Sequence, residues 1–88
     1  MRVVVCAANR ARFTGELVIG VRHYDALMRQ QINNSESFRG DPVDQGFIDQ
    51  NGVFMDRVEA LAVATAAGQI GRYRPKNAGD WLCSEDLY

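Results

Sequence analysis

The chain has few of the residues from which catalytic and metal sites are usually built, with one histidine and two cysteines among its 88 residues. Cys6 and Cys83 lie at opposite ends of the sequence, and neither has a second cysteine at CxxC spacing. Structural zinc sites take closely spaced Cys and His ligands, so we predict no metal and no cofactor. A nucleophilic triad needs a base, and His23 is the sole imidazole. We expect a protein that is not an enzyme, with both thiols packed as small hydrophobic groups.

Long apolar runs are also missing. No run approaches the roughly 20 residues that a membrane helix needs, and residues 1–8 are too short an apolar block for a cleaved signal peptide. We therefore expect a cytoplasmic protein without membrane contact. The net charge of −1, from 10 basic and 11 acidic residues, argues against a nucleic acid polymer as partner. GxGxxG and P-loop spacings are absent, which leaves nucleotide-triphosphate hydrolysis unsupported.

Lysine is nearly absent, because nine of the ten basic residues are arginine. Arginine presents a planar fork of donors that binds carboxylates and phosphates at two points, whereas lysine is a point charge. The bias indicates a localised anion site. GC-rich coding DNA would give the same composition, so both explanations stay open at this point.

Residues 45–70 are rich in local structural signals. Phe47-Ile48 and residues 53–55 read as two short strands around Asn51-Gly52, a dipeptide that readily takes the two positive φ values of a tight hairpin turn. Asp56 then caps a helix, with Glu59 in the capping-box position. We predict that this helix spans residues 57–67 and ends at Gly68, where a left-handed residue is favoured.

The predicted helix at 57–67 is apolar around almost its whole circumference. A helix of this kind is normally buried on several sides, and a chain this short has little protein with which to cover it. We therefore predict a homo-oligomer with this helix at a subunit interface. The alternative is that its alanines are simply good helix formers that tolerate exposure.

The first half of the chain predicts two strands and one helix. Residues 2–8 form a β-branched run typical of a buried strand, residues 9–15 read as a turn, and residues 17–21 as a second, antiparallel strand. A helix opens near Asp25 and is broken at residues 33–35, and residues 35–44 read as an exposed loop. The whole chain, residues 1–88, is thus predicted to be one α+β domain with a small antiparallel sheet and two helices, assembled as an oligomer.

Three places are candidates for an anion site. Arg22 and His23 follow a strand and precede a helix, where backbone amides favour an anion, although a locally hydrogen-bonded histidine is the commoner arrangement. Arg57 lies in the first turn of its helix, against the helix dipole, and would serve equally well in a salt bridge. Residues 72–76 combine Arg72, Tyr73, Arg74 and Lys76, a mixture that suits phosphates and a stacked base or a solvated loop.

The chain resembles the small phage proteins of the first Thoeris anti-defence family. The motifs that carry the resemblance span nearly the whole chain: Gly20-Val21-Arg22-His23, Gln45-Gly46-Phe47-Ile48, Phe54-Met55-Asp56-Arg57 with Glu59-Ala60, Ala67-Gly68-Gln69-Ile70, and residues 82–88. The resemblance implies a multimeric, non-enzymatic sponge that binds a cyclic ADP-ribose isomer, or a related cyclic nucleotide, with pockets between subunits. It also implies pocket roles for Arg22 and Phe54, with Arg57, Gln69 and Arg72 or Arg74 as further candidates. The chain departs from the family pattern between Ile70 and Leu82.

We therefore expect a protein that sequesters a cyclic nucleotide immune signal inside an infected bacterial cell, through Arg22, His23, Phe54, Arg57, Gln69, Arg72 and Arg74. Two alternatives are a protein–protein inhibitor of a host defence complex and an enzyme that degrades the same signal. The scarcity of catalytic residues counts against the enzyme, and the arginine cluster counts against a purely protein-directed inhibitor.

Overall fold

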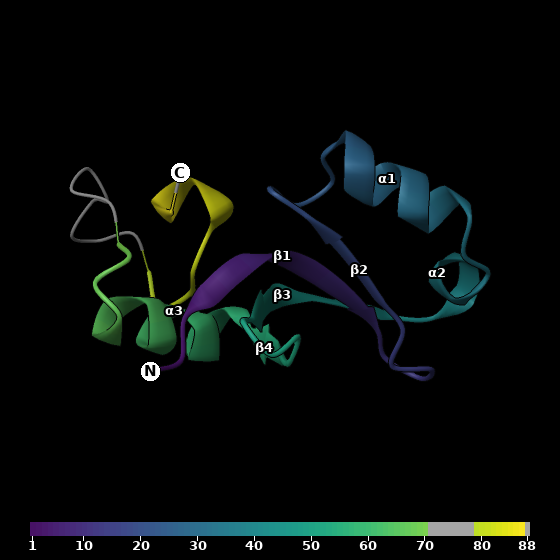
Figure 1. Ribbon diagram of the computed structural model, residues 1–88. Helices are drawn as coiled ribbons and strands as arrows, with labels where there is room; N and C mark the ends of the chain where they lie inside the picture. Colours follow the sequence, from purple (N-terminus) through teal and green to yellow (C-terminus); the bar gives the residue numbers. More distant parts are fainter. Residues whose placement is uncertain (71–78, 88) are drawn as a thin grey trace.

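The computed structural model describes residues 1–70 and 79–87, which form a four-stranded antiparallel sheet in the order β2-β1-β3-β4 (Figure 1). The strands are β1 (Val4–Ala11), β2 (Leu17–Gly20), β3 (Val43–Asp49) and β4 (Phe54–Asp56). The helices are α1 (Ala26–Asn33), α2 (Ser37–Gly40) and α3 (Arg57–Ala66), followed by a short 3-10 helix, η1 (Ser84–Asp86). The predicted α+β class with an antiparallel sheet is confirmed.

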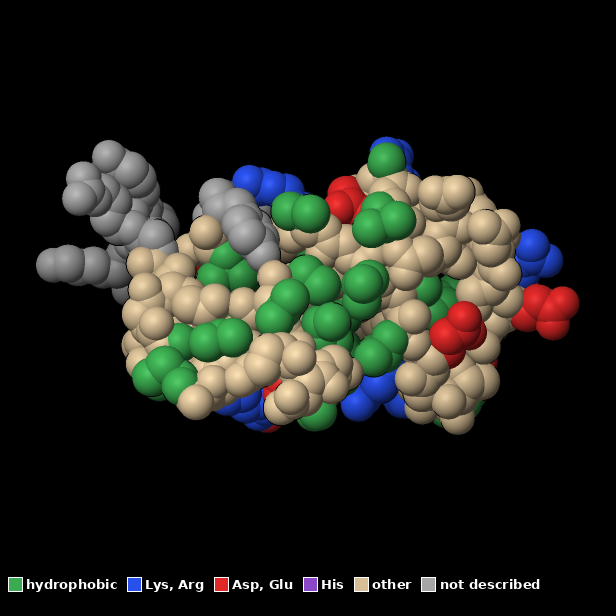
Figure 2. Space-filling model, viewed as in Figure 1, with side chains coloured by type: hydrophobic (Ala, Val, Ile, Leu, Met, Phe, Trp, Pro, Cys, Tyr) green, Lys and Arg blue, Asp and Glu red, His purple; other side chains and the backbone are tan. Residues whose placement is uncertain are grey.

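The two faces of the sheet have different surroundings. Side chains alternate between the faces along each strand, so the strand register sorts them into two sets. The covered face packs against side chains of α1, α3 and the segment before η1, and its members are Ala7, Asn9, Ala11, Val18, Phe47 and Met55. The open face carries Cys6, Ala8, Arg10, Ile19, Asp44, Ile48 and Phe54. Figure 2 shows hydrophobic side chains gathered over the central part of the molecule.

Both longer helices begin at the predicted aspartates. The Asp25 side chain accepts a hydrogen bond from the Met28 amide at 2.9 Å, and the Asp56 side chain accepts one from the Glu59 amide at 2.7 Å. These bonds satisfy amides that the first helical turn leaves without a backbone partner. Gly68 follows α3 with a φ of +70°, which confirms the predicted left-handed stop.

Two glutamine side chains form hydrogen bonds with backbone groups at the margins of the sheet. The Gln31 amide bonds both the N–H and the C=O of Ile19 on the edge strand β2, at 3.0 and 2.6 Å. The Gln69 amide does the same for Val4, at 2.9 and 2.8 Å. Each primary amide therefore mimics a neighbouring strand. An unpaired strand edge is a template for aggregation, and this pairing protects it.

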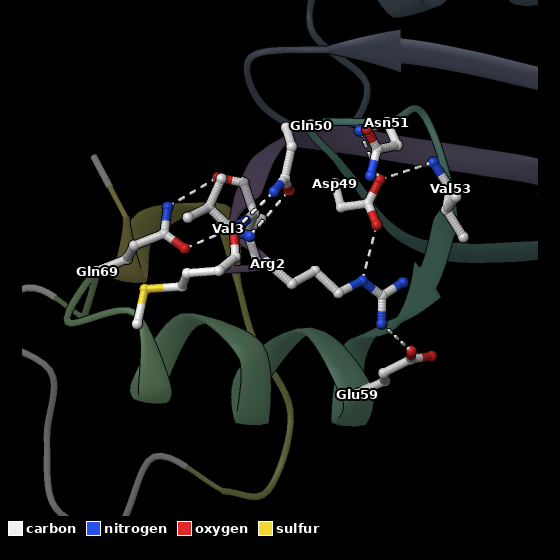
Figure 3. A network of polar contacts seen from close by, with 10 residues as sticks. Arg2, Val3, Asp49, Gln50, Asn51, Val53, Glu59 and Gln69 are labelled. Carbon is white, nitrogen blue, oxygen red and sulfur yellow. Dashed lines mark hydrogen bonds and ion pairs between the residues drawn. The ribbon is translucent and has the colours of Figure 1, made fainter.

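Arg2 fastens the start of the chain to β3 and α3 (Figure 3). Its Nε lies 2.7 Å from the Asp49 carboxylate and its Nη1 lies 2.6 Å from that of Glu59. The Asp49 carboxylate also accepts the amides of Asn51 and Val53, at 2.8 and 3.0 Å. The bond from Arg2, with these two amides, holds the pKa of Asp49 below its ordinary value. Asp49 thus organises the following turn and anchors the first strand.

The predicted boundaries were wrong in the segments that depend on distant pairing. β1 continues to Ala11 where a turn was expected from Asn9, because β3 pairs with it as far as Val43. Residues 35–44 were expected to be an exposed loop, but they contain α2 and the start of β3. The described residues therefore form three helices, not two.

The turn between β3 and β4 is also longer than predicted. Among the described residues Tyr24 is the one non-glycine residue with a positive φ, so Asn51 does not have the left-handed conformation expected of it. The Asp49 amide donates to Val53 O and the Gly52 amide donates to Asp49 O, both at 3.0 Å. This pattern, with Gly52 at φ +77°, is typical of a three-residue hairpin loop.

Helix α3 is buried along one side within the chain. Ala60 and Ala64 are fully buried, whereas Val58 is 61% exposed and Ala62 is exposed. The exposed side leaves room for the predicted subunit interface, and the oligomeric state remains a prediction. None of the helices in the described residues has the length and apolar character to cross a membrane.

Candidate functional site

Asp25 builds the turn that presents Arg22 and His23. Its carboxylate accepts the amides of Val21 and Arg22, at 2.8 and 3.2 Å, besides the helix-capping bond from Met28. The Met28 amide, with those of Arg22 and Val21, holds the pKa of Asp25 below its ordinary value. A Cβ at Gly20 would collide with this carboxylate. The turn is therefore fixed by its own sequence, and Arg22 leaves it as an exposed side chain.

Tyr24 lies in the same turn with strained backbone geometry. Its φ of 59° is unusual for a bulky residue, and such strain is commonest where the surroundings or a function impose it. Tyr24 is 46% exposed, and Arg22 in the same turn is exposed too. One ordered turn thus carries both an exposed cation and an accessible aromatic residue.

His23 connects this turn to β3 and to η1. Its Nε2 lies 2.7 Å from the Gly46 carbonyl and its Nδ1 lies 3.1 Å from Ser84 Oγ. A carbonyl only accepts, so Nε2 carries the proton. The ring also meets Phe47 edge-on, with centroids 5.0 Å apart. Both ring nitrogens are therefore engaged within the protein, which gives His23 the role of a connector between segments.

Arg57 joins the start of α3 to β3 and to the chain end. Its Nη2 donates to Gln45 Oε1 at 2.6 Å and its Nη1 donates to the Leu82 carbonyl at 2.9 Å, with Cys83 Sγ at 3.8 Å. The Leu82 amide in turn donates to the Arg57 carbonyl at 2.9 Å. Each of these partners is uncharged, and within residues 1–70 and 79–87 Arg57 forms no ion pair with a carboxylate. A half-buried guanidinium without a counter-ion is suited to bind an anion.

We define the C-terminal junction as His23, Gln45, Gly46, Arg57 and residues 82–84. His23 and Arg57 reach adjacent residues of β3 and adjacent parts of the chain end. The structure therefore brings together His23 and Arg57, two residues that sequence reasoning singled out. Arg22 precedes His23 in the chain. His23 and Arg57 come from segments far apart in the chain, and the Asp25 turn and the start of α3 position them.

Phe54 lies on the other side of the sheet. The Arg10 guanidinium stacks over its ring at 4.3 Å, and the ring crosses Gly46, where a Cβ would come within 2.7 Å of it. Phe54 is thus a member of the open face, and the structure does not bring it to the C-terminal junction.

The remaining predicted residues fall into two groups. Gln69 uses its amide nitrogen and oxygen on the backbone of Val4, which makes it part of the sheet margin. Arg72 and Arg74 lie outside the described residues. The cluster predicted at 72–76 therefore stays a prediction.

Sequence reasoning missed Asn9 and the part that Gln45 has in holding Arg57. Asn9 is fully buried on the covered face, and its side-chain nitrogen and oxygen have no partner among the described residues. It was assigned to a turn, and its signal would have been a polar residue facing inward once β1 is extended to Ala11. Gln45 was noted only as part of a motif.

Metal chemistry has no support in the described part of the chain, which contains no group of three His, Cys, Asp or Glu side chains placed to hold an ion. Cys6 and Cys83, which were expected to be buried small hydrophobic groups, are half-buried thiols. Burial, with a smaller contribution from the charge of Asp25, raises the pKa of Cys6.

These features define a small antiparallel α+β domain with an arginine-bearing junction formed by the start of α3 and residues 82–84. A family model described as Phage T4 y16D protein matches residues 3–88, and the chain belongs to this family. Neither the curated proteins nor the solved structures gave a match. The family supports a phage origin, which the sequence resemblance had predicted, and the Thoeris connection remains a proposal.

Proposed function

We propose that this phage protein binds and sequesters a cyclic ADP-ribose isomer, or a related cyclic nucleotide, and so blocks TIR-based immune signalling in the infected cell. The observation that carries the proposal is the Arg57 guanidinium, which is half-buried and bonded to uncharged groups. A pyrophosphate would supply a negative charge next to this guanidinium. The sequence resemblance to Thoeris anti-defence proteins supplies the class of ligand.

The order of the site supports binding without turnover. Arg22 leaves a turn fixed by Asp25, and His23 is held by two hydrogen bonds. Groups that are fixed before the ligand arrives lose little conformational entropy on binding, which favours affinity. A sequestering protein depends on this property, since each copy removes one ligand and turns over nothing.

Homo-oligomer formation through the exposed side of α3 is part of the same proposal. Val58 and Ala62 share that side, where small side chains allow two helices to approach closely. Sedimentation at micromolar concentration should give a species larger than the 9.8 kDa monomer, and Val58→Glu should shift it toward the monomer. A wild type that sediments as a monomer throughout would remove the oligomer from the proposal.

A protein–protein inhibitor is the second candidate, and the open face favours it. Ile19 is 37% exposed there, and the half-buried Cys6, Ile48 and Phe54 add to an accessible apolar surface. Apolar patches on soluble proteins often mark contact surfaces. Arg10 and Asp44 would then form its polar rim.

Calorimetric titration with a panel of cyclic ADP-ribose isomers and cyclic di- and trinucleotides tests the proposal. We expect tight binding of one ligand class and a roughly ten- to hundred-fold loss in Arg57→Gln, the range for a hydrogen bond to a charged group. Arg12→Gln is the matched control, because it removes the same charge from the open face, where Arg12 pairs with Asp44. Bound ligand recovered after denaturation should be chemically unchanged.

Three results would contradict the proposal. Absence of binding across the panel would favour the inhibitor. A linear or hydrolysed product that accumulates with time would move the chain to the enzyme class. Equal losses in the Arg57 and Arg12 variants would show that only overall charge matters.

A further inference from the structure

Asn9 differs from the other buried polar residues of the described chain. Ser35 donates to Glu16 at 2.7 Å, Asp49 pairs with Arg2, and Ser84 bonds His23. Asn9 is equally buried, yet its Nδ2 and Oδ1 have no hydrogen-bond partner within residues 1–70 and 79–87. An unpartnered buried amide destabilises a folded protein, and an apolar residue of similar size at this position would avoid the cost. Its presence is accounted for if a bound ligand supplies the partner that the described residues do not.

The position of Asn9 connects it to the C-terminal junction. In the covered face Asn9 lies between Val18 of β2 and Gln45 of β3 in one row across the sheet. Directly opposite residues have Cβ atoms about 4.5–5.5 Å apart, and the Gln45 side chain reaches the Arg57 guanidinium at 2.6 Å. Asn9, Gln45 and Arg57 thus form a polar row that leads from the buried amide to the unpaired positive charge. Gln45 is exposed, so the row opens to solvent at its middle.

The chemistry of this row matches a nucleotide. A primary amide offers a donor and an acceptor side by side, and this pair is complementary to the N6 amino group and N7 of adenine. A guanidinium is complementary to phosphate.

We propose that Asn9 reads the adenine edge of a bound nucleotide whose phosphate lies on Arg57. This inference rests on the proposed function for the location of the phosphate, and it adds the identity of the base. Binding requires the side chains over Asn9 to move aside, and the amide that was unpartnered then gains its two hydrogen bonds. Discrimination against a base that lacks the N6 donor follows from the same geometry.

Titration with ADP and IDP tests the base assignment in the unaltered protein. Hypoxanthine replaces the N6 amino group with an oxygen, which turns the donor into an acceptor opposite Asn9 Oδ1. We expect IDP to bind roughly tenfold or more weakly than ADP, as for a lost bidentate base contact. Equal affinities, or no binding of either nucleotide at millimolar concentration, would overturn the inference.

Asn9→Leu supplies the second measurement, with Asn33→Leu on the exposed side of α1 as the matched control. The Asn9 variant should unfold at higher urea concentration than wild type, because it no longer buries an unpartnered amide, while binding ADP and IDP with the same low affinity. The control should keep the wild-type preference for ADP. An Asn9 variant that is less stable and binds ADP normally would assign the amide to an internal water, which also overturns the inference. If the Asn9 variant does not fold, the ratio of the ADP and IDP affinities of the wild-type protein still tests the base assignment.

These results are independent of the sponge proposal. A protein that prefers ADP over IDP but binds no cyclic ADP-ribose isomer would keep Asn9 as an adenine reader and refute the proposed function. A protein that binds a cyclic isomer with no preference for adenine over hypoxanthine would keep the proposed function and refute Asn9 as an adenine reader.

Discussion

The two faces of the sheet treat charge in different ways. On the open face Arg10 and Arg12 both pair with Asp44, at 3.3 and 2.7 Å, and the bond from Arg12, followed by that from Arg10, lowers the pKa of Asp44. On the covered side the Arg57 guanidinium ends on uncharged groups, and Asn9 has no partner among the described residues. The open face is thus satisfied by its own side chains, whereas the covered side has polar groups left over.

Contact with solvent alone would place the unpaired polar groups on the open face, which is the opposite of what is observed. Water can satisfy an unpaired group on an open face at little cost, but a group under a packed layer has no such substitute. Unpaired groups should therefore collect on the open face, yet Asn9 lies on the covered one. The arrangement is understandable if a ligand supplies the missing partners on the covered side.

The largest expected difference concerns the two phenylalanines of β3 and β4. Phe47 is fully buried on the covered face, and Phe47→Ala should lower the free energy of unfolding by about 3–5 kcal/mol. Phe54 is half-buried on the open face under Arg10, and Phe54→Ala should cost only about 1–2 kcal/mol. Urea unfolding monitored by circular dichroism measures both. Similar costs would show that the open face is covered in solution, for example by a second copy of the chain.

The second prediction concerns ligand affinity. Arg22→Ala should weaken binding by about 1.5–3 kcal/mol, roughly ten- to hundred-fold, while leaving the Asp25 turn intact, because the turn is held by backbone amides. Arg22→Lys should restore little, since a point charge cannot reproduce a forked contact. Arg39 on α2 is exposed, and Arg39→Ala is the control. Unchanged affinity in a folded Arg22→Ala protein would separate the Asp25 turn from the site.

The third prediction separates a structural glutamine from a ligand-binding one. Gln69→Ala removes the two hydrogen bonds to Val4 and should lower the free energy of unfolding by about 1–2 kcal/mol, with ligand affinity unchanged. Gln30 is exposed on α1, and Gln30→Ala should leave stability the same within error. A Gln69 variant of normal stability and reduced affinity would return this residue to the binding site that the family resemblance implied.

Local signals in the sequence were sufficient for part of the fold. The start of a helix near Asp25, the cap at Asp56 and the stop at Gly68 depend on a few neighbouring residues, and each was predicted correctly. The extension of β1 through Asn9 depends on pairing with a strand more than 30 residues away, and polar residues there imitate a turn. The loop at Asn51 is set by the Asp49 carboxylate, whose position depends on Arg2. Contacts of this range leave no pattern in a short stretch of sequence.

The site divides in the same way. Arg22, His23 and Arg57 were singled out as candidates from their neighbours in sequence alone. Asn9 could not be found in this way, because its burial and its lack of a partner among the described residues are properties of the assembled sheet. Phe54 matched a motif, but alternation along β4 directs its ring to the open face.

The smallest expected effect is a change in the pH dependence of stability. The pKa of Asp49 is lowered by the bond from Arg2 and by two backbone amides (Figure 3). A depressed pKa stabilises the folded state fully above the ordinary value, near 4, and the contribution is lost as the pH falls through the folded-state pKa. The thermal midpoint of wild type should therefore fall between about pH 5 and pH 3, and that of Asp49→Asn should fall less steeply.

The comparison must be made between variants, because other carboxyl groups contribute with the same sign. The pKa values of Glu16, Asp25 and Asp44 are also lowered, chiefly by Ser35, by the Met28 amide and by Arg12 respectively, so the Asp49 variant still loses stability in acid. Glu36→Gln removes an exposed carboxylate and should give a curve parallel to wild type. The Asp49→Asn and wild-type midpoints should converge as the pH falls, since a protonated Asp49 resembles an asparagine. Midpoints that remain equally far apart at every pH would show that Asp49 acts through the shape of its turn and not through its charge.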